Sequence, residues 1–98
     1  MKAWMLPLLL CAAPALAQDM NVARSLAATC ANCHGTDGRA RGKAMPPLAG
    51  MKAPLMLELM ADYRSGAQPG TVMPQIVKGY TEAQLRLVAT YFAAQAKP

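Results

Sequence analysis

Two cysteines and the histidine beside them form the clearest chemical motif of the sequence. Cys30 and Cys33 are separated by two residues and His34 follows directly, which gives the pattern C-x-x-C-H. This pattern is typical of c-type haem attachment: the two thiols form thioethers with the vinyl groups of one porphyrin, and the imidazole binds the iron on its proximal side. The sequence therefore predicts one covalent haem c, attached through Cys30 and Cys33, with His34 as the proximal iron ligand.

Other kinds of site also contain a C-x-x-C pair. A thioredoxin-like redox pair is expected in a βαβ unit, and the sequence has no such pattern. A structural zinc site needs four ligands, whereas after residue 17 the sequence holds two cysteines and one histidine. A haem-free thiol or metal module is therefore the least favoured interpretation.

The first 17 residues have the features of a secretory signal peptide. Lys2 precedes an apolar run over residues 5–16, and Ala15-Leu16-Ala17 forms an A-x-A cleavage site. The run is shorter than the roughly 20 apolar residues that a membrane span needs. We expect cleavage after Ala17, a periplasmic location, no membrane span and one domain over residues 18–98.

A lipoprotein signal is the alternative interpretation of the N-terminus. Cys11 follows three leucines, but Leu10 is large where a small residue is expected before a lipidated cysteine. We therefore expect Cys11 to leave with the signal peptide, so that no cysteine remains for a structural disulfide. A small exported domain without disulfides has difficulty in stabilising a core, and a covalently attached haem would supply the centre of that core.

The chain is basic, with 10 Lys and Arg residues against 5 Asp and Glu residues and a formal net charge of +5 at pH 7. It has no long basic run, and we expect no nucleic-acid partner. The charge favours docking to an acidic protein partner. Arg39, Arg41 and Lys43 lie close in sequence to the C-x-x-C-H motif, and they form either a solvated loop or a basic collar that orients a partner at the haem edge.

Apolar periodicity predicts an all-α domain of three main helices and one short turn. The first helix should begin with Asn21 as its cap, run into Cys30 and end near Gly35. Val22, Leu26 and Cys30 fall on one face of this helix. They are expected to form its apolar face.

The second helix is marked by residues that favour helix ends. Pro54 should start it at the first helical position and Gly66 should end it. Its apolar face is expected to contain Leu55, Leu59 and Tyr63, with Met56 and Met60 on the adjoining strip. The flanking stretches, residues 35–53 and 66–72, contain repeated glycine and proline and are expected to be irregular.

The last helix has the strongest signals. Thr81-x-x-Gln84 is a capping box, and the residues that follow at helical spacing are Leu85, Val88, Ala89 and Phe92. These four residues should form the buried stripe of a helix packed on one face. Before it, a single turn over residues 75–78 should end at Gly79.

The second axial position of the iron calls for another residue type, since the sequence has one histidine. A methionine thioether is a soft ligand that favours ferrous iron. The methionines after residue 17 are Met20, Met45, Met51, Met56, Met60 and Met73. Met73 has enough chain after His34 to reach the far face of a porphyrin and precedes a proline, but the residues alone leave the choice open.

Beyond the motif, the predicted mature chain resembles class I c-type cytochromes along its whole length. It is particularly similar to the haem domains of flavocytochrome c sulfide dehydrogenase and to the halves of periplasmic di-haem cytochromes. The matching segments are Cys30-Ala31-Asn32-Cys33-His34-Gly35-Thr36-Asp37-Gly38, Pro46-Pro47-Leu48-Ala49-Gly50, Tyr63-Arg64-Ser65-Gly66, Val72-Met73-Pro74, Lys78-Gly79-Tyr80-Thr81 and Ala89-Thr90-Tyr91-Phe92. The resemblance implies the class I cytochrome c fold around one covalent haem.

The resemblance also implies roles for individual residues near the haem. Met73 matches the distal iron ligand of the family. Pro46 matches the residue whose carbonyl accepts a hydrogen bond from the proximal histidine, and Pro46 and Leu48 would both line the cofactor. Met45 departs from the family pattern, so a second thioether would lie near the haem and compete with Met73.

The same resemblance predicts how the first and last helices meet. They cross in this fold, so that Ala23 and Ala27 should contact Tyr91 and Phe92. Ala23, Ala27 and Ala28 are all small enough for a second helix to approach closely.

The function implied is one-electron transfer, with no catalytic residue in the chain itself. The resemblance suggests a haem subunit that accepts electrons from a sulfide-oxidising flavoprotein and delivers them to a downstream acceptor. An independent soluble electron carrier is the first alternative. A haem protein with an open distal site that binds an exogenous ligand is the second.

Overall fold

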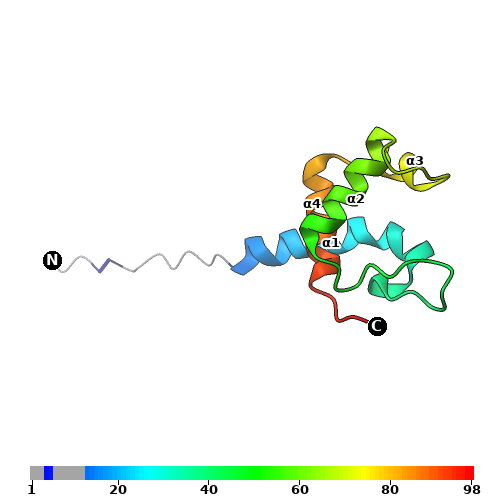
Figure 1. Cartoon of the computed structure of the whole chain (residues 1–98). Coiled ribbons are helices and arrows are strands. Elements are labelled where there is room, and N and C mark those ends of the chain that lie inside the picture. The colour runs from blue at the N-terminus through cyan, green and yellow to red at the C-terminus, as the bar shows by residue number, and fades with distance from the viewer. Residues whose placement is uncertain (1–3, 6–12) are drawn as a thin grey trace.

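The computed structural model describes residues 4, 5 and 13–98, with the backbone alone for residues 13–18. In these parts of the chain it contains the helices α1 (Ala13–His34), α2 (Ala53–Ser65), α3 (Met73–Lys78) and α4 (Glu82–Ala93), and a short 3-10 helix, η1 (Thr36–Gly38). No strand occurs in the described residues. The predicted all-α fold is confirmed, and Figure 1 shows α1 crossing α4.

α1 is longer than the sequence predicts. It begins at Ala13 and not at Asn21, because the residues before Asn21 include alanine and leucine, which favour helices. Lys2 and Cys11 lie outside the described residues, as does most of the predicted signal peptide. Cleavage after Ala17 therefore stays a prediction.

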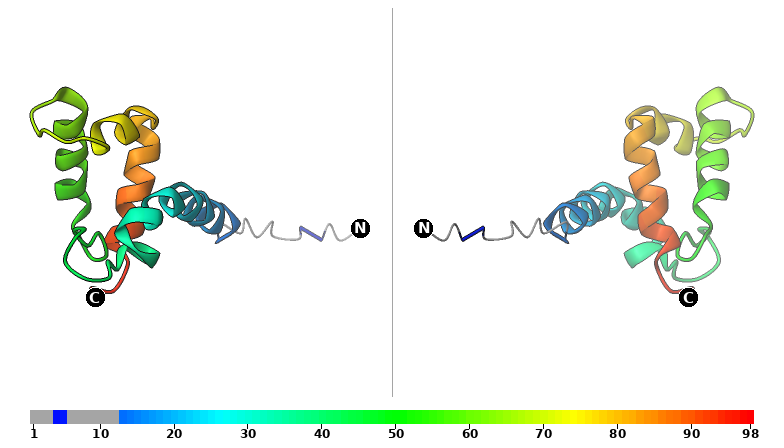
Figure 2. Two further views of the ribbon diagram at one scale, coloured as in Figure 1. Left: turned by 90° about the vertical axis from the view of Figure 1, so that its right-hand side faces the viewer. Right: turned by 90° about the vertical axis from the view of Figure 1, so that its left-hand side faces the viewer.

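The core forms where α1 crosses α4. Ala23 and Ala27 are fully buried in one cluster with Tyr91 and Phe92, as the resemblance predicts, and Phe92 has no exposed surface. The small alanine side chains let the two helices approach closely, and the aromatic rings fill the space beside them. Figure 2 shows this crossing from both sides.

The predicted apolar face of α1 is partly wrong. Val22 is about half exposed, whereas Leu26 and Cys30 pack at the edge of the core. The face of α1 that meets α4 carries Ala23 and Ala27. Close helix packing selects these small residues over the larger Val22.

α2 has the predicted ends but a different buried face. Pro54 lies in its first turn, and Gly66 ends it in the left-handed conformation (φ 88°). Met56 and Met60 are the buried residues, with 4% and 8% exposure, whereas Leu55 is 48% exposed. Two apolar strips overlap on this helix, and the flexible methionine side chains are the ones that fill the irregular core.

α4 confirms its predicted cap and stripe. The Thr81 hydroxyl accepts a hydrogen bond from the Gln84 N–H (3.1 Å), and the Gln84 side chain accepts one from the Thr81 N–H (2.9 Å). The four stripe residues, Leu85, Val88, Ala89 and Phe92, are all buried.

Of the two stretches predicted to be irregular, residues 66–72 are irregular as predicted, whereas residues 35–53 contain a short helix. η1 interrupts the first stretch, and Asp37 within it has a left-handed backbone (φ 55°). α3 begins at Met73, two residues before the predicted turn, because Pro74 is accommodated in its first turn. Met73 is therefore a helical residue.

Candidate haem site

The C-x-x-C-H residues occupy the last turns of α1, with His34 as its final residue. Cys30 is half-buried and Cys33 is exposed, and both are free thiols. Residues three apart on a helix are neighbours on its surface. The two thiols are therefore placed to react with one flat molecule lying against the end of α1.

His34 is buried, with 6% exposure, and its Nδ1 lies 2.8 Å from the Pro46 carbonyl oxygen. A carbonyl only accepts hydrogen bonds, so Nδ1 carries the proton and donates it. The lone pair of Nε2 is then available to a metal, and the hydrogen bond fixes the ring orientation. The donor set at the end of α1, two thiols and one oriented imidazole, fits a covalent haem.

The segment that carries Pro46 is fastened to the rest of the site by backbone hydrogen bonds. The Gly38 carbonyl accepts from Leu48 N–H (2.8 Å) and Ala49 N–H (3.1 Å), and Gly50 N–H donates to the Phe92 carbonyl (2.8 Å). Leu48, which was predicted to line the cofactor, is partly buried against the core. These bonds hold the Pro46 carbonyl in place for His34.

Gly38 is the residue that permits this arrangement. Its φ is 78°, and a Cβ added there would lie 2.8 Å from both Ala49 N and Phe92 Cδ1. Glycine adopts positive φ readily and leaves room for close backbone approach. The turn after His34 therefore depends on the missing side chain.

Met73 is the first residue of α3, the helix that follows α2. The Pro46 segment precedes α2, so α3 and this segment connect to opposite ends of α2. It is partly buried and packs against the edge of the core cluster. In Figures 1 and 2 the end of α1 lies between α3 on one side and the loop after η1 on the other. The structure thus places the elements that carry Met73 and Pro46 on opposite sides of the C-x-x-C-H turn.

The remaining methionines differ in exposure. Met56 and Met60 are buried in the core, Met51 packs at its edge, and Met20 and Met45 are exposed. Met45 lies in the loop just before Pro46, on the side of the His34 hydrogen bond.

Burial raises the pKa of the Cys30 thiol, and the neighbouring Cys33 raises it by a smaller amount. Cys30 is therefore held in the thiol form at neutral pH. In the part of the chain that the structure describes, no three Cys, His, Asp or Glu side chains gather as a metal site would require.

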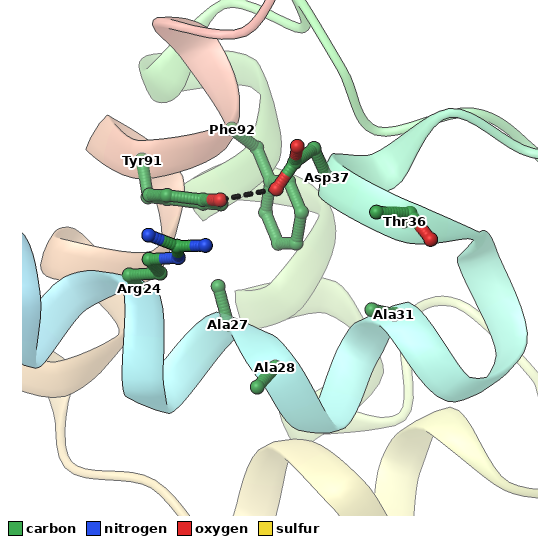
Figure 3. A pocket seen from close by; sticks show the side chains of 8 residues that line it. All are labelled: Arg24, Ala27, Ala28, Ala31, Thr36, Asp37, Tyr91 and Phe92. Atoms are coloured by element: carbon green, nitrogen blue, oxygen red, sulfur yellow. Dashed lines mark hydrogen bonds between the residues drawn. The ribbon is translucent and has the colours of Figure 1, made fainter.

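A small pocket lies between α1, η1 and α4, and Figure 3 shows its lining residues. Inside it the Tyr91 hydroxyl donates a hydrogen bond to Asp37 Oδ1. That bond to Asp37, together with burial, raises the pKa of Tyr91. The pocket contains none of the predicted haem residues, and its hydrogen bond instead ties η1 to α4.

The basic residues of the loop, Arg39, Arg41 and Lys43, are exposed. Both a solvated loop and a basic collar for a partner require this exposure. Arg39 Nε donates to the Ala96 carbonyl (3.2 Å), so this side chain links the loop to the C-terminal segment. Arg41 and Lys43 are exposed to solvent.

Two residues with structural roles were missed by the sequence reasoning. Arg64 Nη2 donates to the carbonyls of Val77 (2.7 Å) and Tyr80 (2.6 Å). The Tyr80 hydroxyl donates to the Leu26 carbonyl of α1 (3.4 Å). Both residues stand in segments that match the cytochrome resemblance, but the match alone assigns them no contact.

The fold and the donor set define a class of protein that comparison with known families confirms. The family model described as Cytochrome c matches residues 20–95. The chain belongs to the cytochrome c family, and it is an electron carrier with covalently bound haem c.

Several curated proteins are similar to it. Over 72 residues it is 35% identical to the cytochrome subunit of sulfide dehydrogenase of Chlorobaculum tepidum, a match that covers 74% of this chain and 64% of that protein. It is 32% identical to cytochrome c4 of Pseudomonas aeruginosa over 79 residues, with 81% of this chain and 39% of that protein covered. Cytochrome c-554(548) of Halomonas halodenitrificans is 30% identical over 70 residues, covering 68% of this chain and 84% of that protein.

The chain spans less than two thirds of the length of the first two of these relatives. Within the described part of the chain, none of the helices combines the length and the apolar character that crossing a membrane requires.

Proposed function

We propose that this cytochrome is an exported one-electron carrier that receives electrons from a sulfide-oxidising flavoprotein and passes them to a downstream acceptor. Cys30 and Cys33 form the thioethers, His34 is the proximal iron ligand and Met73 is the distal ligand. The observation that carries the ligand assignment is the hydrogen bond from His34 Nδ1 to the Pro46 carbonyl, which leaves Nε2 for iron.

His34 contributes an imidazole of fixed orientation. Its Nδ1–H is held by Pro46, whose own segment is tied to Gly38 and to α4 by backbone hydrogen bonds. A ligand held in this way keeps its orientation when the charge of the metal changes. Small reorganisation of this kind suits electron transfer.

Met73 is the methionine whose position best suits the opposite axial site. Met56 and Met60 are enclosed by the core, and Met45 and Met51 lie on either side of the segment that binds His34 from the proximal side. Met73 instead begins α3, across the end of α1 from that segment (Figure 1). These placements support Met73 over the other candidates.

When bound, haem c supplies a one-electron iron couple. His34 and Met73 would hold the iron, and the Met73 thioether would favour its ferrous state. The chemistry that the group would supply is electron transfer. We therefore assign no catalytic residue to this chain.

The flavoprotein partner is proposed from one relative and from charge. The Chlorobaculum tepidum relative is named as a subunit of sulfide dehydrogenase. Arg39, Arg41 and Lys43 are exposed on the loop between η1 and the Pro46 segment. A basic rim of this kind guides an acidic partner and acts mainly on the association rate.

Rapid mixing of sulfide with the purified chain and a co-expressed candidate flavoprotein tests the partner. We expect haem reduction to follow flavin reduction, and to slow when Arg39, Arg41 and Lys43 are each replaced by Gln. Arg86→Gln is the control, since it removes one positive charge from an exposed position on α4. If the reduced flavoprotein never reduces the haem, the chain is an independent carrier.

Mass spectrometry of the chain made with a haem-attachment system tests export and attachment together. The expected species begins at Gln18 and carries one haem. A species that retains Cys11 with a lipid adduct would contradict the proposed periplasmic form.

A further inference from the structure

We propose that Tyr63 and Arg64, adjacent residues in the last turn of α2, hold the two ends of α3 and thereby position Met73 for iron. The inference rests on the proposed role of Met73 as distal ligand. It assigns to Arg64 a positioning role that acts on the ligand through α3.

Arg64 holds the C-terminal end of α3. Its Nη2 donates to the Val77 carbonyl at 2.7 Å and to the Tyr80 carbonyl at 2.6 Å. The last carbonyls of a helix lack partners within the helix and carry partial negative charge. Val77 carries one of these last carbonyls, and Tyr80 follows two residues after the end of α3. The Arg64 guanidinium forms charge-assisted hydrogen bonds with both carbonyls, and such bonds are stronger than neutral ones.

The charge of Arg64 is directed at these carbonyls. Among the described residues the ion pair found is Arg86 with Glu82, one helical turn apart on α4 and exposed. Arg64 and Arg86 line the same groove beside α2 and α4. Arg64 and Arg86 thus lie in one groove but bind different partners, so a variant of Arg86 is a matched control for a variant of Arg64.

Tyr63 holds the N-terminal end of α3. A Cβ placed on Gly70 would lie 3.1 Å from Tyr63 Cε1 and 3.2 Å from Pro74 Cδ. The tyrosine ring, the Gly70 backbone and the Pro74 ring therefore meet around one point. Pro74 directly follows Met73, so this contact restrains the residue next to the ligand.

α3 depends on such outside contacts because it has little stability of its own. It contains six residues, and no side chain caps its N-terminus. Isolated helices of this length are marginal in water. Val77 is buried in the core, but the segment from Gly66 to Val72 that precedes α3 is irregular and exposed.

Because α3 is one short helix, a change at its C-terminal carbonyls is transmitted to Met73 one turn away. Arg64→Leu removes the charged donor from the Val77 and Tyr80 carbonyls, and the Val77 carbonyl keeps the longer hydrogen bond from the Tyr80 N–H (3.3 Å). The Met73 thioether then competes less well for the iron. Loss of hydrogen bonds to a charged donor corresponds to a change of about tenfold to hundredfold in such a competition.

Imidazole titration of the ferric holoprotein measures this competition directly. Imidazole replaces the thioether, so the Met-to-iron charge-transfer band disappears as it binds. We expect Arg64→Leu to bind imidazole about tenfold to hundredfold more tightly than the parent. Arg64→Lys should recover part of the difference, because lysine keeps the charge but not the fork of donors.

Arg86→Leu is the control and should bind imidazole like the parent. The midpoint of denaturant unfolding, followed by far-ultraviolet circular dichroism, is measured on the same samples. Imidazole affinity that is unchanged in Arg64→Leu, or that changes equally in Arg86→Leu, would overturn the inference. The inference would also be overturned if the imidazole affinity changed in step with the unfolding midpoint across all variants.

Met73→Ala separates this inference from the function on which it rests. If Met73→Ala keeps the charge-transfer band, Met73 is not the ligand and both proposals fail. If Met73→Ala loses the band while Arg64→Leu binds imidazole like the parent, the ligand assignment stands and the positioning role alone is refuted.

Discussion

The crossing of α1 and α4 and the junction of α2 with α3 are held together by different interactions. At the crossing, Ala23 and Ala27 pack in one apolar cluster with Phe92. At the junction, one arginine side chain binds the Val77 carbonyl of α3 and the Tyr80 carbonyl that follows this short helix. The first region supplies the stability of the fold, and the second adjusts where one side chain lies.

This difference bears on how the two regions respond to change. Apolar burial acts on the whole folding equilibrium, since the crossing exists in the folded state alone. A hydrogen-bonded anchor on a short peripheral helix acts on local opening. Mutations in the two regions are therefore expected to separate global unfolding from loss of the distal ligand.

The largest expected effect is that of Phe92→Ala at the crossing. Phe92 is fully buried, and removal of such a ring costs about 3–5 kcal/mol. We expect the helical signal and the charge-transfer band to be lost together at a much lower denaturant concentration. Val22→Ala, on the exposed surface of α1, is the control. If Phe92→Ala lost the charge-transfer band at a much lower denaturant concentration than the helical signal, the proposed difference between the two regions would be contradicted.

Gly38→Ala should have the next largest effect, because it acts on the turn after His34. The new Cβ would meet Ala49 and Phe92 at a positive φ, and strain of this kind costs about 1–3 kcal/mol. Gly42→Ala is the matched control: its φ is also positive, but a Cβ there meets no atom within 4 Å. Denaturant unfolding of both variants measures the difference, and equal destabilisation would show that φ alone, and not the close approach, is responsible.

Tyr91→Phe should have the smallest effect at neutral pH, about 1 kcal/mol for one hydrogen bond. The folded-state pKa of Tyr91 is raised, so its contribution to stability is complete below the ordinary tyrosine pKa of about 10 and is lost as the pH rises through the folded-state value. The difference in stability between parent and variant should therefore shrink above about pH 10.

Denaturant unfolding of parent and variant at a series of alkaline pH values measures that difference. Comparison of the two proteins removes the contribution of lysine titration, which they share. A difference that grows with pH would contradict the sign of the pKa shift.

Much of the fold was predictable from local sequence signals. The Thr81–Gln84 capping box, the glycine at the end of α2 and the stripe ending in Phe92 each depend on residues close in sequence. The C-x-x-C-H motif likewise specifies its chemistry within five residues. The helix features were confirmed because helix propensity and spacing determine them, and the haem c that the motif predicts agrees with the cytochrome c family.

The features that were missed depend on contacts between distant segments. Periodicity allowed two apolar strips on α2 and could not identify Met56 and Met60 as its core face. The hydrogen bonds of Arg64 and Tyr80 join side chains to backbone carbonyls of other elements, which leave no pattern in the sequence. Asp37 has a left-handed backbone, which Asp adopts more readily than most residues, and its carboxylate accepts a hydrogen bond from Tyr91, far along the chain.

The ligand pair is the central claim, and the spectrum and midpoint potential of two methionine variants test it most directly. Met73→Ala should abolish the Met-to-iron charge-transfer band, open the iron to exogenous ligands and lower the potential, since the thioether no longer favours ferrous iron. Met45→Ala, in the loop beside Pro46, should leave all three unchanged. Loss of the band in Met45→Ala with Met73→Ala unchanged would contradict the assignment.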